Sequence, residues 1–419
     1  MILSRINPLC SCRSTLYQRV RPLTTSMRVL NDRRPVWVLT DGSIQSTLSG
    51  MALGKKLGHV ELKTVVTSKG LQVFPPIVQK YLVDWFLSRK KAEQGKLPWY
   101  LTVKEGEWSG QRPDFVVCSA PEAIPACLSV SKNNPFTYSV YVGYPNIPFV
   151  YFDQVVLPKY EMDAKLAKLG PFYSKQKNSI ATQVPLLDIE KGNEGYLKDI
   201  LPSSFLEPHS NMMVFVIGGY TPQCRWYSED ASLIADNIQR IVKKLHGKVA
   251  VIFTEKTTPE VKEKIMKIHN HHTDSIAIWD AMVDTETSLT RAHIYQSMID
   301  KATRVVITAD LDYSVAHAAA KRKPVYIVFG DRCRQHLLRF HRWARDNRIT
   351  RKLRLDRGRG ASHKQQHHAY DPLSYLGHHG SWADGYHLVK NQDTLDYIKQ
   401  EVTELRQERV TGKRRKDKD

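Results

Sequence analysis

The sequence lacks the short motifs by which several enzyme classes are recognised. Its 419 residues contain no GxGxxG fingerprint of dinucleotide binding, no P-loop, no GxSxG and no CxxC. No apolar run approaches the roughly 20 residues that a membrane-spanning helix needs, so no transmembrane segment is predicted. The six cysteines show neither the spacing of metal ligands nor a disulfide framework, which is typical of reduced thiols inside a cell. A hydrolase or an NTPase therefore has no residues to support it.

The first 31 residues contain no aspartate or glutamate. Five arginines and a scatter of serines and threonines occupy this stretch instead. An arginine-rich, serine-rich and acid-free start is typical of a mitochondrial transit peptide, so residues 1–31 predict import into the matrix and are excluded from the fold. An unstructured basic tail is the other interpretation. Met27 adds an alternative start that would omit the presequence, and a location on the outer surface of the mitochondrion stays open.

The formal net charge is +20, from 62 basic and 42 acidic residues, and it is unevenly distributed. Residues 332–359 hold eleven arginines and lysines against two aspartates, and residues 401–419 form a charged tail. Such runs are usually solvated chain. The sharper interpretation is contact with RNA or anionic lipid through 332–359, although aromatic residues are not regularly interleaved with the arginines. The charge indicates anionic partners and says nothing about the fold.

Two series of alternating strand and helix patterns predict an α/β fold. In the first, the apolar run 36–40 precedes a helix pattern at 48–57 and a strand at 60–66, which together make one βαβ unit. Its other strands are predicted at 113–118, 136–141 and 154–157, and its other helices at 77–88 and around 126–130. The second series has strands at 212–217, 248–253, 275–279, 304–308 and 324–329, and helices at 228–246, from 259 and at 314–322. We therefore predict two doubly wound, Rossmann-like domains, 33–185 and 211–400, joined by a linker at 186–210.

The second series starts with the stretch MMVFVIGGYTPQCRW, residues 212–226. Its apolar half is typical of a strand buried on both faces of a parallel sheet, and Gly218-Gly219 ends it. Ligands of α/β folds bind beyond the carboxyl ends of such strands. Two glycines at this place let a backbone approach a phosphate or a sugar without an intervening Cβ. The plainer interpretation is that the glycines only make a tight exit from the strand.

Seven stretches, taken in order, link this chain to a known family. They are VWVLTDG at 36–42, FDQVVLPKYE at 152–161, VFVIGG at 214–219, TTPE at 257–260, RVVITAD at 304–310, KPVYIVF at 323–329 and ITRKL at 349–353. Over about residues 36–400 the chain resembles the elongated-mitochondria (ELM) fission-factor family. The resemblance implies the GT-B plan of sugar-nucleotide glycosyltransferases, in which two Rossmann-like domains face each other across a cleft. It also implies a role in mitochondrial fission, with dynamin-like fission machinery or another mitochondrial protein as partner.

The same resemblance gives candidate residues for the cleft. They are Asp41, Gly42, Ser43, Gly218, Gly219, Thr221, Lys256, Thr257, Asp310, Ser314 and His317. The chain departs from the family at some of these places. Lys256 and Thr257 stand where the family has paired arginines, and lysine lacks the fork of arginine. His317 stands at the place of a glutamate, and histidine cannot replace a carboxylate that accepts from a ribose diol. Gln45 and Ser49 stand where the family's opening has a glycine and a glutamine.

Two patterns suggest a metal site, and each has a plainer explanation. Asp310-Leu311-Asp312 fits the two-carboxylate motif of metal-dependent glycosyltransferases, but the GT-B plan needs no metal and two acids one residue apart are common. The histidines at 363, 367, 368, 378, 379 and 387 are irregularly spaced among polar residues, which favours a loop over a zinc site. We therefore expect neither a metal nor another cofactor.

Three hypotheses of function follow from these patterns. The first is a mitochondrial binding protein of the ELM type, acting in morphology or fission, and it is favoured because the polar ligands of the cleft are thinned. The second is an active, metal-independent GT-B glycosyltransferase, in which Lys256 and the helix after Gly219 would stabilise the departing diphosphate of a nucleotide sugar. The third is a basic, RNA-associated protein of the matrix, which rests on charge alone. Whether the protein is an enzyme stays open at this point.

Overall fold

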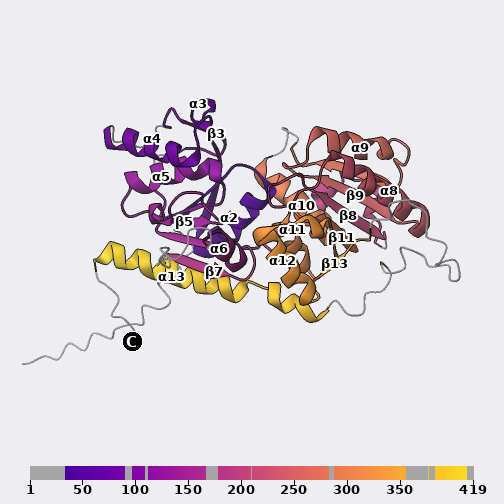
Figure 1. Cartoon of the computed structure of the whole chain (residues 1–419). Coiled ribbons are helices and arrows are strands. Elements are labelled where there is room, and N and C mark those ends of the chain that lie inside the picture. Colours follow the sequence, from indigo (N-terminus) through magenta and orange to yellow (C-terminus); the bar gives the residue numbers. More distant parts are fainter. Residues whose placement is uncertain are drawn as a thin grey trace, which may run out of the picture.

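The computed structural model shows two α/β domains side by side (Figure 1). The residues that it describes are 34–89, 97–108, 112–166, 178–208, 210–282, 287–354, 376 and 383–412. The expected presequence, the histidines from 363 to 379 and the last part of the basic segment lie outside these ranges. No helix within them combines the length and the apolar character that a membrane crossing would require.

The first domain is built on one twisted sheet with the strand order β3-β2-β1-β4-β5-β6-β7. Its strands are β1 Pro35–Thr40, β2 His59–Thr67, β3 Leu101–Glu105, β4 Phe115–Cys118, β5 Tyr138–Val142, β6 Gln154–Pro158 and β7 Ser179–Thr182. Its helices are α2 Ile44–Leu57, α3 Lys69–Gln72, α4 Pro76–Arg89, α5 Ile124–Asn133 and α6 Lys159–Leu166. All strand pairs are parallel except β2 with β3, which is antiparallel and closes the edge. The strands β3 and β7 were not predicted from the sequence.

The second domain repeats the plan with the strand order β10-β9-β8-β11-β12-β13, all parallel. Its strands are β8 Met212–Ile217, β9 Lys248–Phe253, β10 Ile276–Asp280, β11 Arg304–Thr308, β12 Val325–Val328 and β13 Thr350–Lys352. Its helices are α8 Ser228–Leu245, α9 Pro259–His269, α10 Ser288–Lys301, α11 Asp312–Ala320 and α12 Gln335–Asp346. The prediction of two doubly wound, Rossmann-like domains is confirmed.

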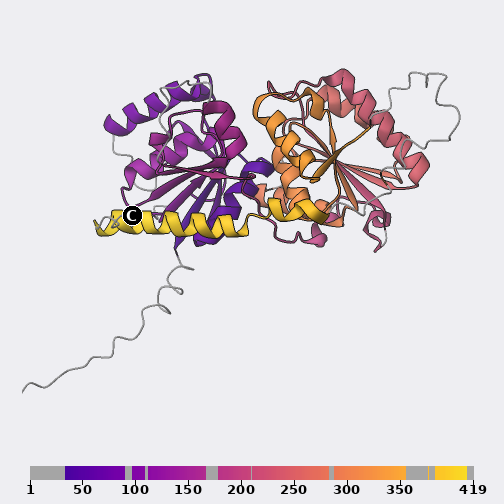
Figure 2. The ribbon, with the colours of Figure 1, turned by 60° about the horizontal axis from the view of Figure 1, so that its bottom comes forward.

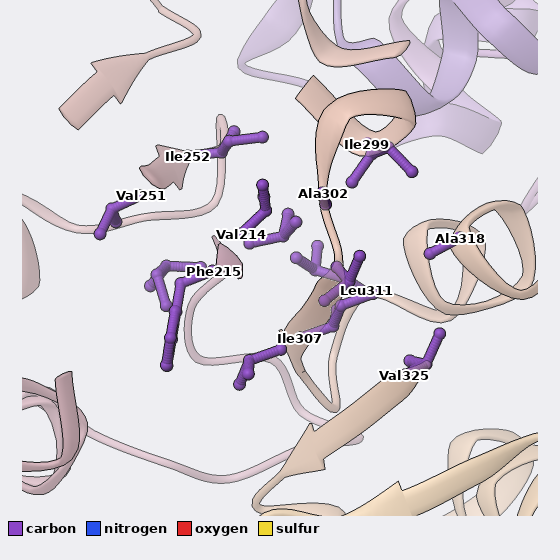
Figure 3. Packing of buried hydrophobic residues seen from close by; sticks show 14 of the residues in the cluster. Val214, Phe215, Val251, Ile252, Ile299, Ala302, Ile307, Leu311, Ala318 and Val325 are labelled. Atoms are coloured by element: carbon purple, nitrogen blue, oxygen red, sulfur yellow. The ribbon is translucent and has the colours of Figure 1, made fainter. Parts of the chain in front are cut away.

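The core of the second domain lies on both faces of its central strands (Figure 3). Every residue of β8 is buried, as its continuous apolar sequence predicts for a central parallel strand. Phe215 of β8 and Ile307 of β11 are fully buried in the same cluster. Ile44 and Leu48 of α2 also belong to this cluster, although α2 is part of the first domain. The two domains therefore share apolar contacts and do not meet through polar groups alone.

The connection between the domains, predicted as a linker at 186–210, is packed against the second domain. Leu187, Leu197, Leu201 and Phe205 are at most 3% exposed and belong to the core of the second domain. The last of these lies in the short helix α7, Ser203–Leu206. Apolar residues in a connection are buried when a neighbouring face is available, and the scattered polar residues of this stretch concealed that pattern.

Helix α13, Gln392–Thr411, corrects the expected end of the second domain at 400 and the charged tail from 401. It lies along the first domain (Figure 2). Leu395, Ile398 and Val402 follow a helical spacing and pack in one cluster with Val36 and other residues of the first sheet. Arg406 and Arg409 of this helix form ion pairs with Asp114 and Asp153 of the first domain. Residues 413–419 of the predicted tail lie outside the described residues. The chain thus returns to its first domain after completing the second.

Part of the basic segment 332–359 forms helix α12, which is folded and not a solvated run. Leu337, Phe340 and Ala344 are buried on its inner side. Arg339 and Arg342 are exposed on the other. An amphipathic helix with this division packs by its apolar stripe and leaves its charges in water.

Candidate functional site

The carboxyl ends of the two sheets face each other, and the turn after β1 lies at this place. Gly42 has a φ of 90°, and a Cβ on it would lie 2.9 Å from Ser288 Oγ at the start of α10. Its carbonyl oxygen accepts a 2.6 Å hydrogen bond from Arg291 Nη1 of the second domain. Asp41 accepts from the backbone N–H of Ser43 at 2.9 Å, and the Ser43 hydroxyl caps α2. The predicted residues 41–43 therefore form part of the contact between the domains.

Gly218 and Gly219 do follow β8 at the carboxyl edge, but their N–H groups have internal partners. Gly218 N donates to Thr308 Oγ1 at 2.8 Å, and Gly219 N donates to Asp310 Oδ2 at 3.1 Å. A Cβ on Gly218 would lie 1.9 Å from Asp310 Oδ2, and a Cβ on Gly219 would lie 1.9 Å from the carbonyl oxygen of Lys256. The two glycines are thus explained by close approach of the protein's own groups.

The carboxylate of Asp310 occupies the place where the sequence suggested a phosphate. It is 2% exposed, and its Oδ1 accepts a 3.0 Å hydrogen bond from Trp226 Nε1. Lys256 Nζ lies 3.5 Å from the carbonyl oxygen of the same aspartate. The Asp310 side chain thus uses the backbone and indole N–H donors that could otherwise bind an anionic ligand.

Thr221 and Thr257 stabilise the local backbone. Thr221 closes a turn with Cys224, whose N–H donates to Thr221 Oγ1 at 3.0 Å. Thr257 is buried, and its hydroxyl donates to the carbonyl oxygen of Ile217 at 2.6 Å while accepting from Thr254 N at 3.0 Å. These bonds position the loop after β9, which carries Lys256, beside the end of β8.

Ser314 and His317 are buried in α11 and do not line the cleft. His317 is 0% exposed, and its Nε2 donates to the carbonyl oxygen of Asp188 in the connection at 3.1 Å. Its ring stacks with Tyr313 at a centroid distance of 5.9 Å. Burial, with a smaller contribution from Lys321, lowers the pKa of His317 to about 3, so the imidazole is neutral at pH 7. His317 therefore binds the segment that connects the two domains, and the structure does not bring it together with Gly218-Gly219.

Two carboxyls that the sequence did not single out complete the surroundings of Asp41. Glu122 follows β4, and Glu255 follows β9. Both side chains are exposed, yet the surrounding protein raises the pKa of each carboxyl, chiefly through partial loss of hydration and also through repulsion from Asp41. Their position at the carboxyl ends of predicted strands was the signal that could have identified them.

One pocket lies between the first sheet and the start of α11. Its volume is about 50 Å³, and Gln45, Ser49, Glu161 and Asp312 are among its lining residues. A cavity needs roughly 10–15 Å³ to hold a water molecule, so this one has room for a few waters and not for a nucleotide sugar. Asp312 accepts a 2.7 Å hydrogen bond from Tyr160 Oη, so its hydrogen-bond partner differs from those of Asp310.

Comparison with known proteins identifies the family of this chain. A family model described as "Mitochondrial fission ELM1" matches residues 48–378. The chain belongs to this family. The protein RP120 of Rickettsia prowazekii (strain Madrid E), which carries the description "uncharacterized", is 23% identical over 322 residues, covering 70% of this chain and 83% of that protein.

Solved structures similar to this ELM1-family protein include enzymes that act on nucleotide sugars. The E. coli ADP-heptose heptosyltransferase II is 12% identical with a TM-score of 0.41, covering 88% of this chain and 99% of that one. The UDP-GlcNAc 2-epimerase of Methanocaldococcus jannaschii is 10% identical with a TM-score of 0.45 and the same coverages. The strand orders themselves show two doubly wound, Rossmann-like sheets.

Proposed function

We propose that this ELM1-family protein acts in mitochondrial morphology or fission as a binding protein, on a GT-B-like scaffold that does not take a nucleotide sugar. One observation carries the proposal. The N–H groups of Gly218 and Gly219, the natural donors for a diphosphate at this edge, already donate to Thr308 and Asp310.

The charge of Asp310 adds a direct penalty. A diphosphate at the end of β8 would bring its own negative charge close to the buried carboxylate. Two like charges about 4 Å apart repel by about 4 kcal/mol at the effective dielectric constant of a protein surface. The ammonium of Lys256 would attract the diphosphate by a Coulomb energy of similar size, so it offsets this repulsion without leaving a net electrostatic gain for the ligand.

A binding protein also needs an exposed surface for its partner, and α4 provides a candidate. Ile77, Tyr81 and Trp85 are four residues apart, so they lie along one side of the helix. Their exposed fractions are 37%, 60% and 46%. Neighbouring Val73 and Phe74 extend this apolar surface. Exposed patches of large apolar residues mark sites of interaction with other proteins, which supports a protein partner.

An active GT-B glycosyltransferase is the second candidate, and the acids of the cleft favour it. Asp41, Glu122 and Glu255 belong to loops at the facing carboxyl ends of the two sheets. The raised pKa of each carboxyl, Glu122 and Glu255, is a shift in the direction that a general acid requires. In this alternative, Lys256 would contact the departing diphosphate.

Calorimetry with uridine, guanosine and cytidine diphospho-sugars separates the two candidates. We expect no saturable binding by the parent protein, because Asp310 occupies the donors. Lys256→Ala is the informative variant, and Lys267→Ala, which removes an exposed lysine of α9, is its matched control. Gly219→Val is unsuitable, since its Cβ would collide with the Lys256 carbonyl. Tight binding of one nucleotide sugar that Lys256→Ala abolishes and Lys267→Ala preserves would contradict the proposal and make the transferase the better candidate.

We also propose a mitochondrial location, with import into the matrix. The proposal is supported by the acid-free composition of residues 1–31 and by the family to which the chain belongs. A partner on the outer surface of the mitochondrion could not contact a protein that is imported into the matrix, so the location limits which partners are possible.

A further inference from the structure

Two buried thiols lie in contact beside the candidate site. The Sγ atoms of Cys224 and Cys333 are 3.1 Å apart, and both cysteines are free thiols. Cys224 belongs to the loop between β8 and α8, and Cys333 precedes α12. Their sulfurs are closer than an ordinary van der Waals contact, so a covalent bond between them requires a movement of only about 1 Å.

The backbone geometry is that of a pair which a disulfide can join. Cys224 and Cys333 form an isolated antiparallel bridge. Arg334 N donates to Gln223 O at 2.7 Å and Arg225 N donates to Arg332 O at 3.4 Å, so the two cysteines are directly opposite and not bonded to each other through their backbones. The Cα atoms of such a pair are about 4.5 Å apart, within the range of disulfides.

His341 of α12 distinguishes the two sulfurs. Its Nε2 lies 2.7 Å from the carbonyl oxygen of Ala309 and therefore donates to it, which leaves Nδ1 as an acceptor. Among the described residues, Nδ1 is buried without a hydrogen-bond partner at ordinary distance. Burial alone would lower the pKa of His341, but the Cys333 thiol beside it raises it. The imidazole therefore favours the thiolate form of Cys333, and it is not among the groups that shift the pKa of Cys224.

The two thiols consequently have different chemistry. The Cys224 thiol and, against the effect of burial, His341 lower the pKa of Cys333 to about 6, whereas the pKa of Cys224 is raised by Cys333 and by burial. Cys333 is 4% exposed and Cys224 is 0% exposed. A small oxidant therefore meets Cys333 first and meets it as a thiolate, which is the reactive form.

We propose that Cys224 and Cys333 form a reversible intrachain disulfide under oxidation by a hydroperoxide. The Cys333 thiolate attacks one peroxide oxygen, the O–O bond breaks, and Cys333 becomes a sulfenic acid while hydroxide leaves. The Cys224 thiol then attacks the Cys333 sulfur, the S–O bond breaks, and water leaves. In sum, two thiols and one hydrogen peroxide give one disulfide and two waters. A dithiol reductant reverses the bond by exchange.

The disulfide would join two segments that are 109 residues apart in the sequence. Cys224 is two residues from Trp226, which donates to Asp310. Cys333 leads into α12, whose Phe340 packs on Tyr160 of the first domain at a ring distance of 5.0 Å. Oxidation therefore fixes the loop after β8 to the helix that contacts the opposite domain.

Peptide mapping of the peroxide-treated full chain tests the proposal. After treatment and alkylation of the remaining thiols, we expect the loss of two hydrogens and a linked peptide that joins Cys224 to Cys333, with recovery of both thiols in dithiothreitol. The matched control is the Cys118→Ser, Cys127→Ser double variant, which removes the other two buried thiols of the described chain and should still form the link. A link between Cys118 and Cys127 instead, two thiols still reduced in excess peroxide, or a link that dithiothreitol does not reverse would overturn the proposal.

Two further variants test the order of attack. In Cys224→Ser, the sulfenic acid on Cys333 should persist and react with dimedone. In Cys333→Ser, dimedone should not label Cys224. His341→Gln should shift the pH at which the link forms half-maximally upward, because the thiolate then appears at higher pH. Labelling of Cys224 alone, or an unchanged pH profile in His341→Gln, would contradict the roles assigned to these residues.

Discussion

Polar residues at the carboxyl edge of the second sheet make hydrogen bonds within the protein and thereby stabilise the fold. Asp310 accepts from Gly219 and Trp226, and His317 reaches across to the connection at Asp188. Each of these bonds satisfies a polar group that burial would otherwise penalise by about 1–3 kcal/mol. The edge that holds ligands in many α/β proteins is thus occupied here by side chains of the chain itself.

His317 predicts a specific dependence of stability on pH. Its pKa is about 3 in the folded protein and about 6.5 in an unfolded chain. Above about pH 6.5 both states hold a neutral imidazole, and below it only the unfolded state gains the proton, so stability falls as the pH decreases. Between about pH 6 and pH 4, the parent should lose about 1.4 kcal/mol per pH unit more than His317→Gln.

The measurement is the free energy of unfolding by urea at several pH values. His271→Gln, which changes an exposed histidine after α9, is the control and should keep the slope of the parent. Equal slopes in the parent and in His317→Gln would show that His317 is not held neutral.

Among the elements, helix α13 packs on the first domain, so the stability of that domain depends on residues near the C-terminal end of the chain. Its apolar side covers the first sheet through Leu395, Ile398 and Val402. Ion pairs add to this packing, including Arg406 with Asp114 at 2.6 Å and Lys56 with Asp396 at 2.7 Å. Because such half-exposed pairs are worth at most about 1 kcal/mol, the apolar contacts dominate.

Ile398→Ala should therefore destabilise the protein. Ile398 is 0% exposed, and loss of a buried isoleucine side chain costs about 2–5 kcal/mol, including the cavity that it leaves. Tyr397→Ala removes a larger side chain from the neighbouring position, which is 56% exposed, and should change stability by about 0.5 kcal/mol or less. Chemical denaturation of both variants checks the difference. Similar small effects in the two would mean that α13 does not pack on the first sheet.

Elements were predictable from sequence where their own pattern determines them. The buried strands β8 and β11 have continuous apolar runs, and α8 has a regular apolar stripe, so all three were predicted. Helix α13 was missed because its buried side consists of a few apolar residues among many charges. Strand β3 was missed because it is short and half polar at the edge of its sheet.

The candidate site was less predictable because its bonds join residues that are distant in the sequence. The sequence suggested that Gly218-Gly219 leave room for a phosphate or a sugar, and nothing near them in the sequence indicates that Asp310 and the carbonyl oxygen of Lys256 approach them instead. The same holds for His317 and Asp188, which are 129 residues apart. Tertiary packing decides whether a polar residue faces a cleft or a neighbouring helix. Local periodicity of the sequence does not predict that packing.

At the scale of the whole molecule, the two domains form one packed unit. The apolar cluster of the second domain includes Ile44 and Leu48 of α2, and Arg291 donates to the carbonyl oxygen of Gly42 across the contact. Helix α13 adds a second crossing between the domains. A chain of this organisation can present the same face to a partner without domain closure, which is in keeping with a binding role.

The location of the whole molecule depends on residues 1–31, whose acid-free composition predicts import. A membrane potential favours movement of each positive charge to the negative side by about 2.3 kcal/mol per 100 mV, so an acid-free segment with five arginines is drawn toward the matrix. A reporter fused to residues 1–31 should enter mitochondria, become shorter and resist added protease while the organelles are intact. The same segment with its arginines changed to glutamine is the control and should stay in the cytosol. A full-length reporter that remains cytosolic would exclude a transit peptide, and a mitochondrial reporter that external protease degrades would place the protein on the outer surface, where fission machinery is accessible.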